Sequence, residues 1–302
     1  MLHTLKGQQL TIQVESKGAE LKSMKDNDND REYMWSSDAK YWGKTSPILF
    51  PFVGASKNGA YSYGGKTYEM SRHGFARDME FELTEQTENT LVFALEDCET
   101  TRENYPFLFR LEIEYQIEGK SLWVRWRVFN KDTKEMYFSI GGHPAFACPP
   151  SKGIDLDVSS KARKRTDCYI KFDGAEEIKI SGIDMASGLA TGESVTYKTE
   201  EGLLPISENL FDKDALVIEN SQCHKVSLCD EHKKPYITVT FDAPLFGVWS
   251  VPDSQAAYVC IEPWYGRCDS TDFVGELQEK DWINSLVPGE AFEKEYEIKI
   301  EE

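Results

Sequence analysis

The chain has 302 residues, of which 40% are hydrophobic and 28% are charged, a balance typical of a globular protein with a large core. Asp and Glu outnumber Lys and Arg by 52 to 34, so the formal net charge is −18 at pH 7. A surface this acidic repels nucleic-acid phosphates and anionic lipids, which argues against nucleic-acid and membrane partners and favours a small neutral ligand.

The sequence also lacks the marks of export and of metal binding. No apolar run approaches the roughly 20 residues of a transmembrane helix, and residues 1–6 lack the apolar core of a signal peptide. The seven cysteines are an odd number without a Cys-x-x-Cys pair, which indicates neither a disulfide framework nor a zinc site. We therefore expect reduced thiols, a cytoplasmic location and no bound metal.

Alternating hydrophobic and polar residues predict strands along most of the chain. The first lies at residues 10–15, and residues 61–68 form a hairpin around the turn Gly64-Gly65. A longer hairpin joins strands at residues 109–117 and 122–128. Further strands are expected at residues 91–95, 236–241, 257–261 and 296–300.

The second long strand carries two different faces. Trp123, Arg125, Arg127 and Phe129 share one of them, and this mixture of aromatic and basic residues predicts that the face lines a groove or packs beneath a second sheet.

Helical periodicity is scarce. Short helices are expected near residues 37–41 and 269–282, and the polar tract at 173–193 is expected to be a loop. The basic run at residues 161–165 is expected to be solvated.

Many antiparallel strands with few helices predict an all-β fold, either a large antiparallel β-sandwich or a barrel. Because the chain shows no linker and no internal repeat, we expect one β-sandwich domain over residues 1–302. Concave sheets of this kind can hold a small polar ligand.

His143 stands out as a candidate for proton transfer. A strand-like run at residues 136–140 leads into Gly141-Gly142, and Pro144 follows the histidine and restricts its backbone. Glycines allow another group to approach closely. Histidine titrates nearest neutrality, so a rigidly presented imidazole suits acid/base work.

Two other stretches offer related chemistry. Residues 71–77 place His73 between Arg72 and Arg77. In the stretch Cys260-Ile261-Glu262-Pro263-Trp264, Glu262 ends an apolar strand, where a carboxylate is costly to bury unless it is paired or functional. The indole of Trp264 offers a flat face on which a sugar ring can stack.

These residue types indicate acid/base catalysis without a cofactor. An imidazole can give a proton while a carboxylate takes one. The chain contains no Gly-x-Ser-x-Gly, no His-Glu-x-x-His and no phosphate-binding glycine loop.

Four short motifs in order resemble the aldose 1-epimerase (galactose mutarotase) family, and in detail its LacX-like branch. They are residues 46–54, 73–77, 141–146 and 260–264, and the similarity spans roughly residues 5–300. The resemblance implies a galactose mutarotase-like β-sandwich with a sugar bound across a concave sheet, in a monomer or homodimer that needs no cofactor.

The resemblance also implies roles for individual residues. His143 matches the acid that protonates the ring oxygen of the sugar, and Glu262 matches the base that takes the proton of the C1 hydroxyl. His73 matches a second histidine that contacts the substrate. Asp214 matches an aspartate that binds sugar hydroxyls, with Asp212 as a close competitor.

The sequence departs from the family at one point. Galactose mutarotases grip sugar hydroxyls with an arginine in a region that here reads Gly54-Ala55-Ser56-Lys57. Arg72, Arg77 or Lys44 are candidates to replace it, and Arg77 and Trp264 complete the expected substrate-binding residues.

Two alternatives to a mutarotase for free hexoses remain open. A hexose-6-phosphate 1-epimerase would require basic residues at the phosphate end of the cleft, for which Arg72, Arg77, Arg125 and Arg127 are candidates. A non-catalytic carbohydrate-binding protein would require no acid/base pair.

Overall fold

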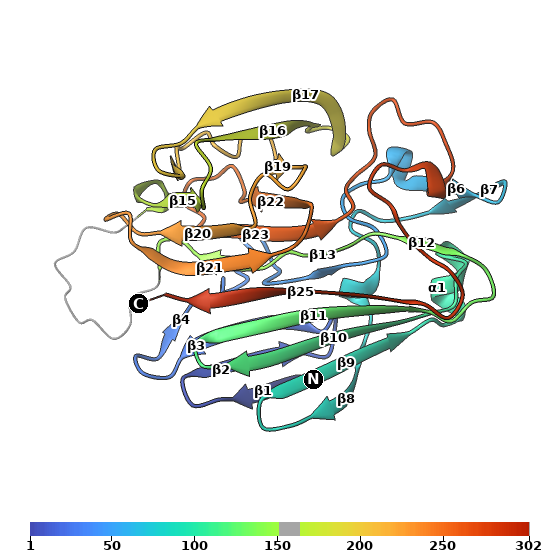
Figure 1. The fold of residues 1–302 in the computed structure, drawn as a ribbon, viewed down its shortest axis with the longest axis horizontal. Helices are drawn as coiled ribbons and strands as arrows, with labels where there is room; N and C mark the ends of the chain where they lie inside the picture. The colour runs from blue at the N-terminus through green and yellow to red at the C-terminus, as the bar shows by residue number, and fades with distance from the viewer. Residues whose placement is uncertain (151–163, 302) are drawn as a thin grey trace.

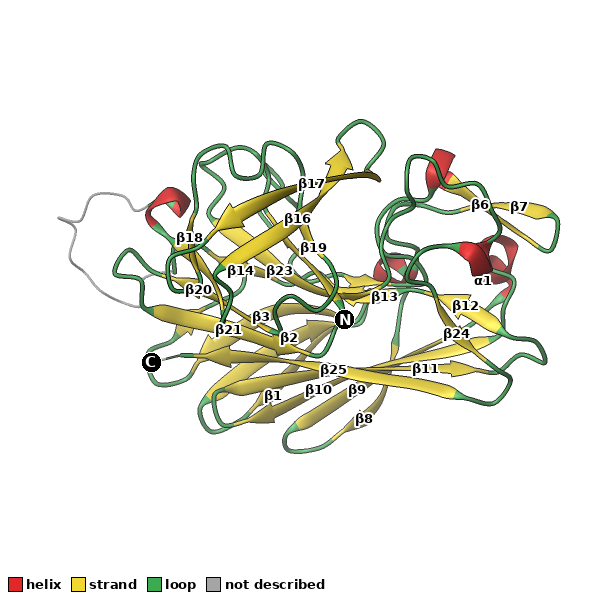
Figure 2. Ribbon diagram, turned by 45° about the horizontal axis from the view of Figure 1, so that its top comes forward, coloured by secondary structure: helices red, strands yellow, loops and turns green. Residues whose placement is uncertain are grey.

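Antiparallel strands dominate the residues that the computed structural model describes, which are 1–150 and 164–301 (Figures 1 and 2). The expected all-β architecture, a large antiparallel sandwich with few short helices, is confirmed. The described residues form two large sheets, one smaller sheet and two two-stranded sheets.

The larger sheet has nine strands. In spatial order they are β18 (Leu203–Pro205), β15 (Tyr169–Phe172), β20 (Lys225–Cys229), β21 (Pro235–Phe241), β25 (Ala291–Ile300), β11 (Ser121–Asn130), β10 (Phe109–Glu118), β9 (Thr90–Glu96) and β8 (Glu82–Gln86). The part of this sheet from β25 to β8 lies below the other large sheet in Figure 1.

The second sheet has eight strands and carries the candidate site. Its order is β17 (Leu189–Lys198), β16 (Glu177–Asp184), β19 (Leu216–Ile218), β22 (Leu245–Trp249), β23 (Tyr258–Tyr265), β13 (Ile140–Gly142) and β5 (Ile48–Leu49), with β14 (Ala145–Ala147) also paired to β23.

The remaining elements are small. A four-stranded sheet contains β1 (Leu2–Lys6), β2 (Leu10–Glu15), β3 (Glu20–Asp26) and β4 (Arg31–Glu32). The hairpin of β6 (Ala60–Tyr63) and β7 (Lys66–Glu69) forms one two-stranded sheet, and β12 (Met136–Phe138) and β24 (Asn284–Leu286), which are distant in sequence, form the other. The helical elements are α1 (Glu99–Asn104) and 3-10 turns at Lys57–Gly59, Ala76–Asp78, Arg165–Asp167 and Leu277–Glu279.

The core lies between the two large sheets because alternate residues of their strands point inward. In β11 every second side chain is buried, as the alternating sequence predicts. Trp126 of this strand is fully buried and contacts Tyr296 of β25 and Tyr265 of β23, with ring centroids 5.1 and 6.3 Å away. These rings therefore join the two sheets and fix the strand that carries Glu262.

The other face of β11 looks outward, so the prediction that it lines a groove or lies beneath a second sheet is wrong. Arg125 and Arg127 are each about a quarter exposed and form a ladder of ion pairs with carboxylates of the neighbouring strands. Arg125 lies 2.6 Å from both Glu114 and Glu295, and Arg127 lies 3.2 Å from Glu112. Flanking carboxylates explain how arginines fit an open sheet face.

Most predicted strands are confirmed, but the tract at 173–193 is not a loop, because β16 and the start of β17 lie in it. β17 is an edge strand, mostly exposed after its first residues, so it lacks the hydrophobic alternation that identifies strands. Of the two expected helices, residues 37–41 form none, and residues 269–282 contain only the turn at Leu277–Glu279.

The basic run at residues 161–165 lies partly outside the described residues, which begin again at Lys164. Lys164 is exposed, as expected, but Arg165 is buried, so the prediction is wrong there. The guanidinium donates to the hydroxyl of Ser250 and to the carbonyl of Ala256, and it lies 5.2 Å from the ring centre of Phe211. These contacts replace part of the water that the charge loses, because both hydrogen bonds come from Nη1, while Nε and Nη2 have no partner among the described residues.

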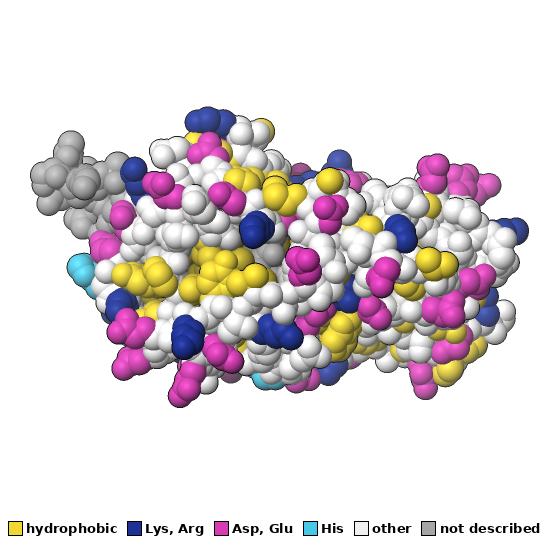
Figure 3. Space-filling view, turned by 90° about the horizontal axis from the view of Figure 1, so that it is seen from above, with side chains coloured by type: hydrophobic (Ala, Val, Ile, Leu, Met, Phe, Trp, Pro, Cys, Tyr) yellow, Lys and Arg dark blue, Asp and Glu magenta, His cyan; other side chains and the backbone are white. Residues whose placement is uncertain are grey.

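No helix of the described residues has the length and apolarity that crossing a membrane requires. On the face shown in Figure 3, acidic and basic side chains are interspersed, with hydrophobic side chains between them.

Candidate active site

One cavity of about 360 Å³ brings together residues from distant parts of the chain. Its walls come from β16, β19, β22 and β23 of the eight-stranded sheet and from the loops that follow β5, β7 and β13. The volume is in the range of sites that enclose small molecules. All six residues predicted for the site line it, namely His73, Arg77, His143, Asp214, Glu262 and Trp264.

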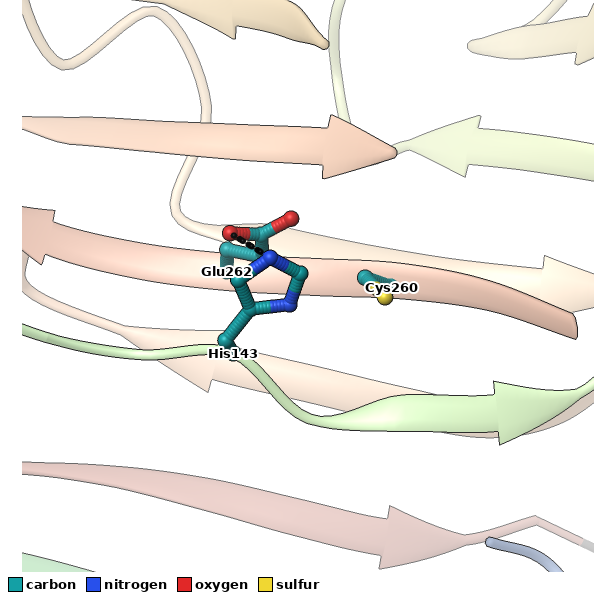
Figure 4. A group of neighbouring side chains, drawn as sticks. All are labelled: His143, Cys260 and Glu262. Atoms are coloured by element: carbon teal, nitrogen blue, oxygen red, sulfur yellow. Dashed lines mark ion pairs between the residues drawn. The ribbon is translucent and has the colours of Figure 1, made fainter. Parts of the chain in front are cut away.

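His143 and Glu262 face each other across paired strands. β13 runs antiparallel to β23, and the loop after β13 is tied back by hydrogen bonds from the His143 N–H to Pro47 O and from the Ile261 N–H to Pro144 O. His143 Nε2 lies 3.2 Å from Glu262 Oε2 (Figure 4). The two residues are only 7% and 1% exposed, so water does not compete strongly for their contact.

Burial shifts the two groups in opposite directions. It lowers the pKa of His143 well below the ordinary value for histidine and raises the pKa of Glu262 well above that for glutamate, with nearby Asp214 adding to the second effect. The nearby indole N–H of Trp264 acts in the opposite direction and lowers the pKa of Glu262, because it favours the ionised carboxylate, although the two groups form no hydrogen bond. Burial therefore favours the uncharged form of each group, which is neutral imidazole for His143 and protonated carboxyl for Glu262.

Aromatic rings surround the imidazole of His143. The indole of Trp42 is tilted over it, with centroids 4.8 Å apart and planes at 31°, while Trp249 and His73 meet it edge-on. Sequence reasoning missed both tryptophans. Trp42 directly follows the segment at 37–41 expected to be a short helix, and the only signal for it was an adjacent aromatic pair, Tyr41-Trp42, in a polar stretch.

Backbone hydrogen bonds around His73 determine which of its two ring nitrogens carries the proton. His73 has a positive φ of 68°, and its N–H donates to Gly54 O. In return the Gly54 N–H donates to His73 Nδ1 over 3.1 Å. Since Nδ1 accepts a hydrogen bond, the neutral ring carries its proton on Nε2. In this form the ring can donate a hydrogen bond through Nε2, and Nδ1 is already occupied by the Gly54 N–H.

We expect protein stability to fall as the pH drops from 7 toward 5. Burial is the main cause that holds the pKa of His73 well below 6.5, and the neighbouring His143 adds to it. Below pH 6.5 the unfolded chain therefore binds a proton at this histidine, whereas the folded chain does not. One such histidine lowers the free energy of unfolding by about 2 kcal/mol in total between pH 7 and pH 5, and the slope approaches about 1.4 kcal/mol per pH unit near pH 5.

Urea titrations at several pH values would measure this effect. His73→Gln should show a shallower decline than the wild type, whereas exposed His224→Gln should not. Equal slopes for His73→Gln and the wild type would contradict the assignment.

Trp264 explains why two glycines lie beneath the cavity. Its indole packs against Gly141 and Gly247, where an added Cβ would come within 2.6 Å of the ring. Neither glycine has a positive φ, so close approach is the reason for them. Because the indole is only 6% exposed, it forms part of the cavity floor, and its stacking on a sugar stays a prediction.

The cavity wall opposite the floor contains Arg72 and Asp214. Their charged groups lie 3.7 Å apart, and the Arg72 guanidinium fills the place of a side chain at Gly188, where a Cβ would meet Nη2 at 1.7 Å. The competitor Asp212 is exposed and does not line the cavity. The structure thus places Asp214, and not Asp212, at the site.

The other basic residues considered for binding a sugar or a phosphate already contact protein groups. Arg77 lines the cavity but donates to Arg72 O and lies 3.7 Å from Asp78. Lys44 lies 3.2 Å from the same aspartate and does not line the cavity. Arg125 and Arg127, on the outer face of the nine-stranded sheet, are also absent from its lining.

Comparison with known proteins places the fold and the motifs in one family. The model of the family described as Aldose 1-epimerase matches residues 1–299. The chain is 31% identical over 304 residues to the chromosomal LacX protein of Lactococcus lactis subsp. lactis, and the alignment covers 98% of each protein.

Solved structures agree with this result. A galactose mutarotase related enzyme from Lactobacillus acidophilus is 32% identical, with a TM-score of 0.89 and coverage of 100% of this chain and 98% of that one. A galactose mutarotase-like protein from Lactobacillus casei is 27% identical, with a TM-score of 0.87 and complete coverage of both chains. The resemblance inferred from the four motifs is confirmed, and the chain belongs to the aldose 1-epimerase family.

Proposed function

We propose that the protein is a cofactor-independent aldose 1-epimerase that interconverts the α and β anomers of an unphosphorylated hexose or a closely related sugar. The observation that carries the proposal is the buried contact of 3.2 Å between His143 and Glu262 at a cavity of sugar size. An acid and a base held this closely can act on the ring oxygen and the C1 hydroxyl of one sugar, since these oxygens share a carbon.

The reaction requires one proton in the pair at its start and at its end. Transfer of the proton from Glu262 to Nε2 of His143 gives a carboxylate and an imidazolium. The imidazolium then protonates the ring oxygen while Glu262 takes the proton of the C1 hydroxyl, the bond between C1 and the ring oxygen breaks, and the open aldehyde forms. After rotation about the C1–C2 bond, the two groups exchange roles and the ring closes on the other face.

The surrounding residues would hold the remaining hydroxyls. His73 presents its Nε2 proton as a donor, and Asp214 presents a carboxylate acceptor next to Arg72. Arg77 and Trp264 complete the predicted set. Trp42 and Trp249 exclude water from the imidazole, which strengthens its charge interactions.

Asp214→Ala should raise KM roughly 10- to 100-fold with a smaller effect on kcat, because a hydrogen bond to a charged group contributes about 1.5–3 kcal/mol. Asp212→Ala is the matched control, two residues away and exposed, and should leave KM unchanged. Steady-state polarimetry over a range of sugar concentrations measures both constants. A larger KM effect from Asp212→Ala would reassign the binding role.

The charges of the cavity favour a neutral sugar over a hexose 6-phosphate. Each described arginine that lines it already has a carboxylate partner: Arg72 has Asp214, Arg77 has Asp78, and Arg267 lies 2.6 Å from Glu219. A phosphate would have to compete with these carboxylates in a protein of net charge −18.

Polarimetry of freshly dissolved α-D-glucose and α-D-galactose tests the proposal directly. Acceleration of mutarotation by the wild-type protein supports it. Acceleration with glucose 6-phosphate alone would favour the phosphorylated substrate, and no acceleration with any of the three sugars would favour a carbohydrate-binding protein.

A further inference from the structure

Cys260 is a buried thiol that the acid/base reaction does not use. It lies two residues before Glu262 on β23, so both side chains project from the same face of the strand. One nitrogen of His143, the sulfur of Cys260 and one oxygen of Glu262 all lie within 4.8 Å of one another, and all three residues are buried (Figure 4). Three different types of metal-binding atom thus lie close together.

This set of atoms matches the coordination preferences of soft and borderline divalent cations. Zinc sites combine Cys sulfur, His nitrogen and carboxylate oxygen, and thiolates favour such metals over magnesium or calcium. One thiolate, one carboxylate and one neutral imidazole also balance a charge of +2. The complex would carry no net charge, which suits a buried position.

The imidazole is free to supply either nitrogen. Nε2 of His143 faces Glu262, and the buried Nδ1 has no hydrogen-bond partner among the described residues, so a metal bound at either nitrogen would break no hydrogen bond of the ring to a residue outside the three ligands. Metal–ligand bonds of roughly 2.0–2.3 Å in a tetrahedron separate the ligand atoms by about 3.3–3.7 Å. The contact of 3.2 Å between His143 and Glu262 is already near this value. Since the three ligand atoms lie within 4.8 Å of one another, each pair would have to approach by about 1.5 Å at most to reach this geometry.

We propose that His143, Cys260 and Glu262 form an inhibitory binding site for a thiophilic divalent cation such as Zn²⁺ or Cd²⁺. Binding releases to solvent the proton that His143 and Glu262 share and the proton of the thiol. His143 and Glu262 line the cavity, so the fourth coordination position opens toward it and the metal excludes the sugar. The inhibition rests on the proposed function, whereas the binding does not.

Titration of the full-length protein with Cd²⁺ tests the binding through the ultraviolet absorption of a cadmium–thiolate bond. The wild type should show this band with one cadmium per chain, and both Cys260→Ser and Cys260→Ala should lose it. Cys268→Ser is the matched control, because Cys268 is also buried and lines the same cavity. It should keep the band. Persistence of the full band in both Cys260 variants would overturn the proposal, and thermal unfolding of each variant verifies that it is folded.

Mutarotation measured with Zn²⁺ present tests the inhibition. Zinc should inhibit the wild type and Cys268→Ser, EDTA should restore their activity, and Cys260→Ala should require at least a 10-fold higher zinc concentration. Equal inhibition of Cys260→Ala and the wild type would overturn the inhibitory site. A cadmium band in a protein that does not accelerate mutarotation would overturn the proposed function and support the metal site.

Discussion

Replacing Glu262 with glutamine is expected to lower kcat for mutarotation about 10²- to 10⁴-fold, the usual contribution of a positioned acid or base. Glutamine keeps the size of the side chain but cannot take a proton from the C1 hydroxyl. KM should change much less, because the residues proposed to hold the other hydroxyls are untouched. Polarimetry with saturating sugar gives kcat directly, and Glu85→Gln, on the exposed part of β8, should behave as the wild type does.

Loss of folding should not explain this result, because Glu262 destabilises the folded protein at neutral pH. Burial raises its pKa, so above about pH 4.5 the unfolded chain ionises the carboxyl while the folded chain resists ionisation, and stability falls as pH rises. Glutamine removes this penalty. Glu262→Gln should therefore melt at the same temperature as the wild type or higher at pH 7. Activity within a few-fold of wild type would exclude Glu262 as the base.

Much of the scaffold was predictable because its strands have one buried and one exposed face. In the long hairpin burial alternates along all of β11 and along β10 except at the buried Glu114, and the turn Gly64-Gly65 has positive φ at both residues, as its sequence predicts. The edge strand β17 was not predictable in this way, since mostly exposed positions can be polar throughout. Arg165 was also unpredictable, because its partners Ser250 and Ala256 lie some 85 residues or more away in sequence.

The site was predictable as a list of residues but not as an arrangement. Motifs indicated which histidines and which glutamate to consider, yet only the pairing of β13 with β23 brings His143 and Glu262 together. The role of Gly141 was also not predictable from the sequence. It makes room for the indole of Trp264, its close neighbour across these two strands. Trp42 carried no motif, because its importance depends on a stacking contact with a residue 101 positions later.

His143→Gln should lower kcat by a similar 10²- to 10⁴-fold, because the amide that replaces Nε2 cannot deliver a proton to the ring oxygen. The exposed His224→Gln is the control and should keep full activity. The double variant His143→Gln/Glu262→Gln adds a sharper test. If the two residues share one proton and act as a unit, removing the second partner should slow the reaction little beyond the first.

Independent action predicts a different result for that double variant. The two single losses would then multiply, and polarimetry would show the product of the separate fold-changes. Such multiplicative losses would contradict a shared proton, even if each single variant lost activity as expected. The double-variant cycle thus tests the mechanism and not only the identity of its residues, because a ring that opens by concerted acid and base catalysis gains nothing from either group alone.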